Sequence, residues 1–338
     1  MTAGERTFRL FACCVPVRGA RRSTICDLQR RAYDLIPNGL YDLLTVHADR
    51  TLDGLRGLFA PETHARIDEY YDFLVRKEYG FWCDDPEAFP PMDETWDRPE
   101  RVTNAIIDVD ARSRHDFADL LRQLDELGCG ALQVRWFVPA PLDEVEAVLR
   151  LATGRRLRAV ELLLPWSAEW PEGAVEGLCR RHMRLSGVVV HSAPEARVAV
   201  VEGVRTPVFH RTEVVDSHAH CGQVSPDWFA VSIQGFTEAK SFNSCLNRKV
   251  SVDAAGEIRN CPSLPRSFGN AADTSLLSAL MRAEFRELWE INKDQVEVCR
   301  DCEFRYVCTD CRAFVQTPGD HYSKPSKCAY DPYAARWA

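Results

Sequence analysis

The sequence predicts an α/β protein built in three parts, and three observations carry this prediction. Residues 101–235 alternate strand-like and helix-like patterns, residues 1–97 combine short apolar runs with helical stretches, and residues 236–338 hold closely spaced cysteines. The chain has 338 residues, which is enough for two or three domains. We therefore expect domains at 1–97, 98–235 and 236–338.

The central part predicts βα units with a parallel sheet. NAIIDVD has the composition of a strand, and HDFADLLRQLDEL, which follows it, is amphipathic. Its apolar side chains on one helical face are Phe117, Leu120, Leu121 and Leu124. Further alternation follows in ALQVRWFV, LDEVEAVLRLA, VELLLP, GAVEGLCRRHMRL and GVVVHS. Strands that alternate with helices favour a parallel sheet, and the stretch is too short for eight units, so we expect a partial barrel.

The flanking parts are less regular. The first part ends in CDDPEAFPPMDETWDRPE, whose Pro and Asp content predicts a linker or a covering loop. The last part contains one clear predicted helix, SLLSALMRAEFRELWEI.

Composition excludes some classes of function. The formal net charge is −8, so the chain lacks the basic balance of a general nucleic-acid binder. It has no apolar run of about 18 residues, and we expect no transmembrane helix and no membrane partner. The start has an apolar run too short for a secretory signal, which predicts a cytoplasmic protein.

The 14 cysteines concentrate after residue 220, where VCRDCEFRYVCTDC places four of them at spacings of two, five and two residues. In the cytosol such clusters hold metal or perform redox chemistry more often than they form disulfides. A zinc knuckle is the simplest interpretation, and an iron–sulfur centre is the alternative. Seven cysteines exceed one tetrahedral site: Cys245, Cys261, Cys299, Cys302, Cys308, Cys311 and Cys328.

This pattern resembles the SPASM domain, an auxiliary iron–sulfur module of many radical-SAM peptide-modifying enzymes. Cys245 is followed by ten residues, Gly256, four residues and Cys261, as in that family. Cys299, Cys302 and Cys308 have the family's spacing. Cys311 follows after two residues where the family has three, which is a departure.

The resemblance implies two 4Fe–4S clusters, with zinc as the alternative metal. It assigns one centre to Cys299, Cys302, Cys308 and Cys328. It assigns the other centre to Cys245, Cys261 and Cys311, with one further ligand upstream. The upstream stretch DSHAHCGQ offers Cys221, with His218 or His220 as substitutes. The alternative interpretation of this stretch is a loop with a buried thiol and two solvent-exposed histidines.

The DSHAH string is also similar to the Asp-x-His-x-His that opens the metal site of amidohydrolase barrels. Those barrels take further ligands from later strands, whereas only His321 lies downstream here. Too little chain remains to complete such a barrel, so this interpretation is set aside.

The central part resembles a truncated, degenerate radical-SAM barrel. A radical-SAM enzyme needs a CxxxCxxC motif after its first strand, but ARSRHDF, which follows NAIIDVD, has no cysteine. Cys13, Cys14 and Cys26 have the wrong spacing for that motif. We therefore expect no cleavage of S-adenosylmethionine. Cys14 and Cys26 either share a metal across adjacent strands or are small buried hydrophobic residues.

The first part is similar to the small winged-helix domain that binds leader peptides of ribosomal natural products, as STICDLQRRAYDLIPNGLYDLLT indicates. Such domains bind an extended leader as an added strand. Five arginines of this part either bind an acidic leader or form a solvated basic face: Arg18, Arg21, Arg22, Arg30 and Arg31.

As a whole, the chain resembles the SPASM-domain peptide maturase of grasp-with-spasm systems, from FACCVPVRGARRSTICDLQR through DSHAHCG to INKDQVEVCRDCEFRYVCTDCRAF. This implies an ATP-grasp ligase and a precursor peptide as partners. Two hypotheses of different class remain: a redox-active enzyme that modifies the peptide, and a non-catalytic scaffold that presents the peptide to the ligase. No catalytic residue is identified.

Overall fold

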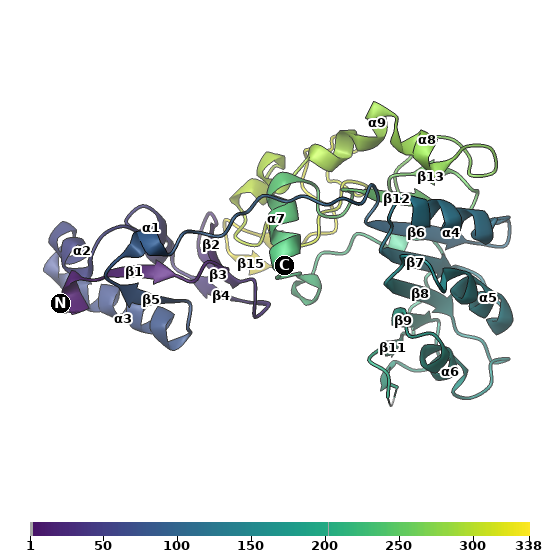
Figure 1. Cartoon of the computed structure of the whole chain (residues 1–338), viewed down its shortest axis with the longest axis horizontal. Coiled ribbons are helices and arrows are strands. Elements are labelled where there is room, and N and C mark those ends of the chain that lie inside the picture. Colours follow the sequence, from purple (N-terminus) through teal and green to yellow (C-terminus); the bar gives the residue numbers. More distant parts are fainter. Residues whose placement is uncertain (1–2, 202) are drawn as a thin grey trace. The chain divides into compact units, whose positions relative to one another are not determined.

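The computed structural model describes residues 3–201 and 203–338 (Figure 1). The chain forms two compact units. The first unit comprises Met1–Trp96, Val224–Ser244 and Ile291–Ala338, and the second comprises Asp97–Gln223 and Cys245–Glu290. Each unit collects separate stretches of sequence, whereas the expected domains 1–97, 98–235 and 236–338 follow one another in order; that division stays a prediction.

The second unit contains an eight-stranded, mostly parallel sheet, which confirms the α/β class. Its strand order is β10-β11-β9-β8-β7-β6-β12-β13, with β10 and β13 antiparallel at the two edges. The strands are β6 (Asn104–Val109), β7 (Ala131–Trp136), β8 (Ala159–Pro165), β9 (Leu185–His191), β10 (Arg197–Val200), β11 (Pro207–His210), β12 (Lys249–Val252) and β13 (Ile258–Arg259). The predicted βα alternation is thus present in β6 to β9.

The apolar face of this sheet packs against three helices, α4 (Phe117–Glu126), α5 (Leu142–Ala152) and α6 (Ala174–Arg181) (Figure 1). The Asp116 side chain caps α4 by accepting from the amide of Asp119. Side chains alternate along strands, so every second residue enters this core. Several of the intervening positions carry polar side chains: Asn104, Asp108, Gln133, Arg135 and Glu161.

The predicted helix SLLSALMRAEFRELWEI is broken in the structure. It forms α8 (Leu276–Leu280), α9 (Ala283–Arg286) and a 3-10 turn at Glu287–Glu290, with Arg282 extended at ψ 130°. In one straight helix, Phe285 would lie about 140° around the axis from Leu280, away from the buried face. The break returns Phe285 to the core, where its ring centroid is 4.7 Å from that of Phe268.

The first unit contains a three-stranded antiparallel sheet that is followed along the chain by three helices. The sheet order is β2 (Cys14–Arg18), β3 (Ser23–Asp27) and β4 (Ala32–Ile36). The helices are α1 (Asn38–Thr45), α2 (Leu52–Leu58) and α3 (His64–Arg76). A separate pair, β1 (Thr7–Leu10) and β5 (Gly80–Cys83), packs its Phe8 and Trp82 against the α3 side chain Tyr71.

The C-terminal segment packs on the opposite face of the β2–β4 sheet. Val17, Cys26 and Leu28 share a core with Phe304 and Tyr330. Every residue of β3 is buried, because the strand is covered on both faces. This unit also contains α7 (Ile233–Ser241), 3-10 turns at Lys293–Gln295 and Cys299–Asp301, β14 (Tyr330–Asp331) and β15 (Arg336–Trp337).

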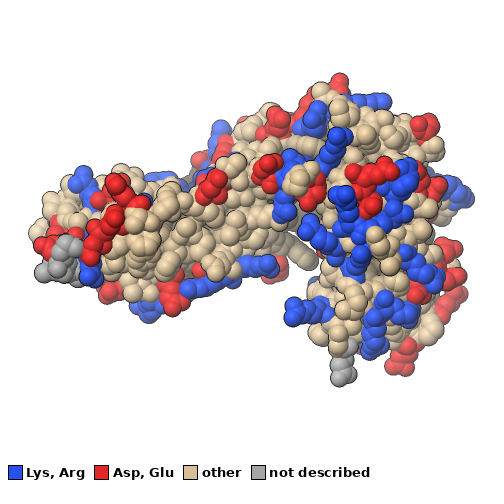
Figure 2. Space-filling view, viewed as in Figure 1, with Lys and Arg blue, Asp and Glu red and all other residues tan. Residues whose placement is uncertain are grey.

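Surface charge is mixed: Figure 2 shows Lys and Arg side chains beside Asp and Glu side chains across the visible face. Within the described ranges, no helix combines the length and apolar character that a membrane span requires.

Candidate metal centre

Four cysteines of the first unit were predicted to bind one metal centre, and their thiols interact electrostatically with one another in pairs. Cys299 opens a 3-10 turn and Cys302 ends it, while Cys308 and Cys328 follow on later loops. Burial, opposed by Lys293 and reinforced by Cys308, raises the pKa of Cys299 to about 12. Burial also raises the pKa of Cys302, with Cys308 and Cys299 adding to the effect. Cys308 in turn interacts with Cys328. Cys308 therefore interacts with each of the other three thiols, and the assignment of all four to one metal centre stays a prediction.

A buried lysine lies among these thiols. Lys293 Nζ donates to Cys308 Sγ at 2.7 Å and to two carbonyl oxygens, of Cys308 at 2.6 Å and Thr309 at 3.0 Å. Burial alone would lower the pKa of Lys293, but the interactions with Cys308, Asp310 and Cys299 outweigh burial and raise it. The group therefore combines soft sulfur donors with a fixed positive charge.

The loop between Cys308 and Cys328 is held by a second buried cation. The side chain of Arg312 has no exposed surface, and its Nη1 donates to the carbonyl oxygens of His321 at 2.8 Å and Ser323 at 3.0 Å. It also pairs with Asp310 at 2.9 Å, and Asp310 accepts from Asn243 Nδ2 at 2.9 Å. These bonds fix the path of the chain between two of the thiols.

Three other cysteines, Cys221, Cys245 and Cys261, lie near one another in the second unit. Burial, followed by Cys245, raises the pKa of Cys261 to about 12, and Cys221 contributes in the same direction. Lys249 Nζ lies 3.4 Å from Cys245 Sγ. The interactions with Cys245, Cys261 and Cys221 raise the pKa of Lys249 against the effect of burial. Each group of thiols therefore has its own ammonium, that of the buried Lys293 and that of the half-buried Lys249.

The two histidines of DSHAHC differ in their surroundings. His218 is half-buried, with Nδ1 3.2 Å from Ser263 Oγ, and it interacts with the charge of Asp108. His220 is exposed and lies 3.1 Å from Asp216. Cys221 is exposed, whereas the alternative interpretation of this stretch expected a buried thiol. Of the three upstream candidates, Cys221 is the one that contributes to the raised pKa of Cys261.

The remaining predicted ligand, Cys311, is half-buried and belongs to the first unit. Cys221, Cys245 and Cys261 belong to the second unit. The assignment of Cys311 to the same centre as Cys245 and Cys261 stays a prediction.

Several polar residues near these thiols were not found from the sequence. Lys249 and Lys293 carry no pattern that marks them. Asp108 and Arg135 did carry a signal, since each is a charged residue within an apolar strand. They form a buried bidentate pair at 2.6 Å and 2.8 Å near the carboxyl ends of β6 and β7, where parallel sheets commonly bind ligands. Arg135 also interacts with Cys221 and Cys261.

Of the two alternatives for Cys14 and Cys26, the strand register contradicts a shared metal. Cys14 is paired with Asp27 across the β2–β3 ladder, and Val15 is paired with Cys26. Neighbouring residues on a strand point to opposite faces, so Cys14 and Cys26 are separated by the sheet. Cys26 is buried in the core shared with the C-terminal segment, where it acts as a small apolar side chain.

Comparison with known proteins identifies one part of the chain. No curated protein matches it. Residues 244–303 match the family model of SPASM, described as an iron-sulfur cluster-binding domain. The matched stretch includes Cys245, Cys261, Cys299 and Cys302, which lie in the two groups of thiols described above. The chain therefore carries a SPASM domain, a type of domain that binds iron–sulfur clusters.

Proposed function

We propose that this protein is a maturation protein for a ribosomally synthesised and post-translationally modified peptide, and that it works with an ATP-grasp ligase. It binds the precursor peptide and carries two 4Fe–4S clusters. The observation that carries the proposal is the SPASM match at residues 244–303, supported by the two groups of thiols and the lysine beside each group.

The four thiols of the first unit fit an iron–sulfur cluster. Four thiolates are the usual ligand set for such clusters. A cluster with four thiolates carries net negative charge, which Lys293 offsets inside the protein. The hydrogen bond from Lys293 to Cys308 is also the kind of contact that tunes a cluster's potential. When bound, the cluster supplies one-electron transfer; four thiolates also suit zinc, which is the alternative metal.

The second candidate function is a non-catalytic scaffold, in which structural zinc or iron–sulfur centres hold a fold that presents the precursor to the ligase. One observation favours it. The turn after β6 contains no cysteine and is held by Arg112 and Ser113, which contact Asp110, and by Ser113 Oγ donating to the Ala254 carbonyl at 2.7 Å. A radical-SAM barrel carries its catalytic cluster at this turn. The chain therefore has no thiolates at this turn to hold a cluster that cleaves S-adenosylmethionine.

The edge strand β4 is the proposed binding site for the leader. In the described part of the chain no strand pairs with its outer edge. Asp34 of β4 accepts from Tyr79 Oη at 2.8 Å and pairs with Lys77 at 3.0 Å, which fixes the strand beside the end of α3. Leu35 and Val75 are each 45% exposed and offer apolar contacts for alternate side chains of an added strand.

The contacts of the five arginines predicted to bind the leader reduce the number of candidates. Arg18 pairs with Asp42, Arg22 pairs with Glu303 at 2.8 Å, and Arg30 pairs with Glu78 at 2.6 Å. These three already hold carboxylates of the chain itself. Arg21 and Arg31 are exposed and are the better candidates to meet an acidic leader.

The test is a titration of fluorescently labelled leader peptide into the full-length protein, with and without the ligase. We expect saturable binding by the protein alone, of moderate strength because an extended peptide loses conformational entropy when it is ordered. A leader that binds the ligase but not this protein would contradict the proposal.

A further inference from the structure

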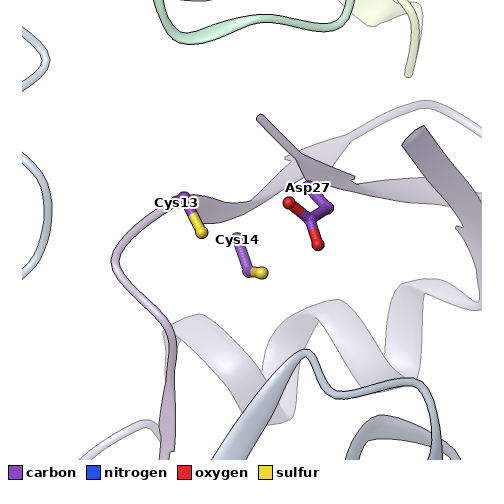
Figure 3. Close-up of side chains that lie close together, drawn as sticks. All are labelled: Cys13, Cys14 and Asp27. Atoms are coloured by element: carbon purple, nitrogen blue, oxygen red, sulfur yellow. The ribbon is translucent and has the colours of Figure 1, made fainter. Parts of the chain in front are cut away.

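Two thiols and a carboxylate meet at the start of the β2–β3 ladder, outside the SPASM segment. The ligating atoms of Cys13, Cys14 and Asp27 all lie within 4.8 Å of one another. Figure 3 shows the three side chains clustered on one side of the sheet, with Cys13 coming from the turn before β2. Cys14 faces Asp27 directly across the ladder, so the two residues share a face.

The backbone fixes these three residues. The amide of Cys14 donates to the carbonyl of Phe11 at 2.8 Å, and the amide of Leu28 donates to the carbonyl of Cys13 at 2.9 Å. Asp27 Oδ1 accepts from the amides of Gln29 at 3.1 Å and Arg30 at 2.8 Å. The tight turn explains how adjacent cysteines present both sulfurs to one point. The two amide hydrogen bonds go to Oδ1 of Asp27, and Oδ2 has Arg30 Nε at 3.5 Å as its ion-pair partner.

The group is buried but can be reached. Cys14 and Asp27 are each 3% exposed, and Cys13 is half-buried. Cys14 lines a cavity of about 360 Å³ together with Phe8, Leu43 and Met92. On the other side, Cys13 Sγ donates to Oε1 of the exposed Gln29 at 3.7 Å. An ion can therefore approach past Cys13 without unfolding the sheet.

We propose that Cys13, Cys14 and Asp27 bind one Zn²⁺ ion, with the fourth position open to water beside Gln29. Two sulfurs and one carboxylate oxygen are a zinc ligand set, whereas Mg²⁺ and Ca²⁺ require oxygen ligands. Binding releases the protons of the two thiols. Two thiolates, one carboxylate and Zn²⁺ leave one net negative charge, and Arg30 Nε, 3.5 Å from Asp27 Oδ2, supplies the opposite charge.

This site is independent of the iron–sulfur proposal, because it uses none of the SPASM cysteines. It links the turn before β2 to the end of β3. Three protein ligands with an open fourth position also leave the ion able to take a small donor ligand from the solvent.

The test measures zinc in full-length protein that carries its native metal content, after equilibration with a zinc buffer. Three variants are compared with the wild type: Cys13→Ser, Asp27→Asn and the control Cys83→Ser. Cys83 is a half-buried thiol of β5 in the same unit, outside the group. Asp27→Asn keeps an oxygen for the amides of Gln29 and Arg30, so it preserves the turn even if Cys13→Ser proves unstable.

We expect wild type and Cys83→Ser to hold one more zinc ion per chain than Cys13→Ser and Asp27→Asn. The variants' affinity for that ion should fall by about 100-fold or more, since loss of even a supporting residue costs up to that much. Cobalt added in place of zinc should give a thiolate charge-transfer band that Cys13→Ser weakens and Cys83→Ser leaves intact. Equal zinc content and equal cobalt spectra in all four proteins would overturn the proposal.

Discussion

Arg22 donates from Nε to Oε1 of Glu303 at 2.8 Å, although 281 positions separate the two residues in sequence. The Glu303 side chain is fully buried, and Tyr330 Oη donates to the same carboxylate. Thr24 Oγ1 donates to the Glu303 carbonyl at 2.9 Å. Because Glu303 directly follows Cys302, the proposed leader-binding sheet and one proposed metal centre share a buried polar contact.

The first prediction concerns this contact. Glu303→Gln removes the negative charge that Arg22 and Tyr330 bind, and breaking a buried pair from one side costs about 3 kcal/mol. Urea unfolding followed by tryptophan fluorescence should show this loss. Glu297→Gln, an exposed residue of the same segment, should stay within about 0.5 kcal/mol of the wild type. Equal effects of the two substitutions would mean that the pair does not stabilise the unit.

The second prediction concerns Lys293. Lys293→Met removes the ammonium that donates to Cys308 Sγ, so the reduced, more negative form of the cluster loses stabilisation. The reduction potential of that cluster should therefore become more negative, as measured by anaerobic redox titration. Arg300→Gln removes a positive charge from the exposed surface of the adjacent turn and should leave the potential nearly unchanged. A potential that both variants leave unaltered would place the cluster away from Lys293.

The third prediction concerns the leader. Leu35→Asp places a charge at the exposed edge strand and should weaken leader binding about tenfold, the effect of losing about half of a buried leucine contact. Val46→Asp is the matched control, since Val46 is 71% exposed near the end of α1. The measurement is the dissociation constant of the labelled leader. Equal weakening by both variants would place the binding site elsewhere.

The fourth prediction concerns acid stability of the second unit. Arg181, followed by His182, lowers the pKa of Glu146 from its ordinary 4.5 to about 2. A carboxylate with a lowered pKa stabilises the fold above its unfolded pKa, and this contribution is lost as the pH falls through the folded value. The melting temperature of the wild type should thus exceed that of Glu146→Gln at pH 6, and the difference should shrink between about pH 4.5 and 2. A difference that is constant with pH would contradict the assigned cause.

Local patterns predicted the parallel strands well, because apolar β-strands separated by amphipathic helices leave few alternative arrangements. The spacing of Cys299, Cys302 and Cys308 also predicted metal ligands, because such spacing is local, and the SPASM match includes the first two of them. The break at Arg282 was not, because it depends on where Phe268 lies. Glu303 was missed for the same reason, because Arg22 and Thr24 come from a distant segment, whereas Lys293 was missed because nothing in the sequence marks it as the partner of Cys308. The Cys14–Asp27 pairing required the strand register, which composition does not give.

The central claim is that this chain binds two 4Fe–4S clusters through its two groups of thiols. Anaerobic purification followed by iron, acid-labile sulfide and zinc analysis tests it most directly. We predict about eight iron and eight sulfide per chain, with about half of each lost in Cys302→Ala. Protein that contains zinc at the SPASM cysteines, with no acid-labile sulfide and no brown colour, would contradict it.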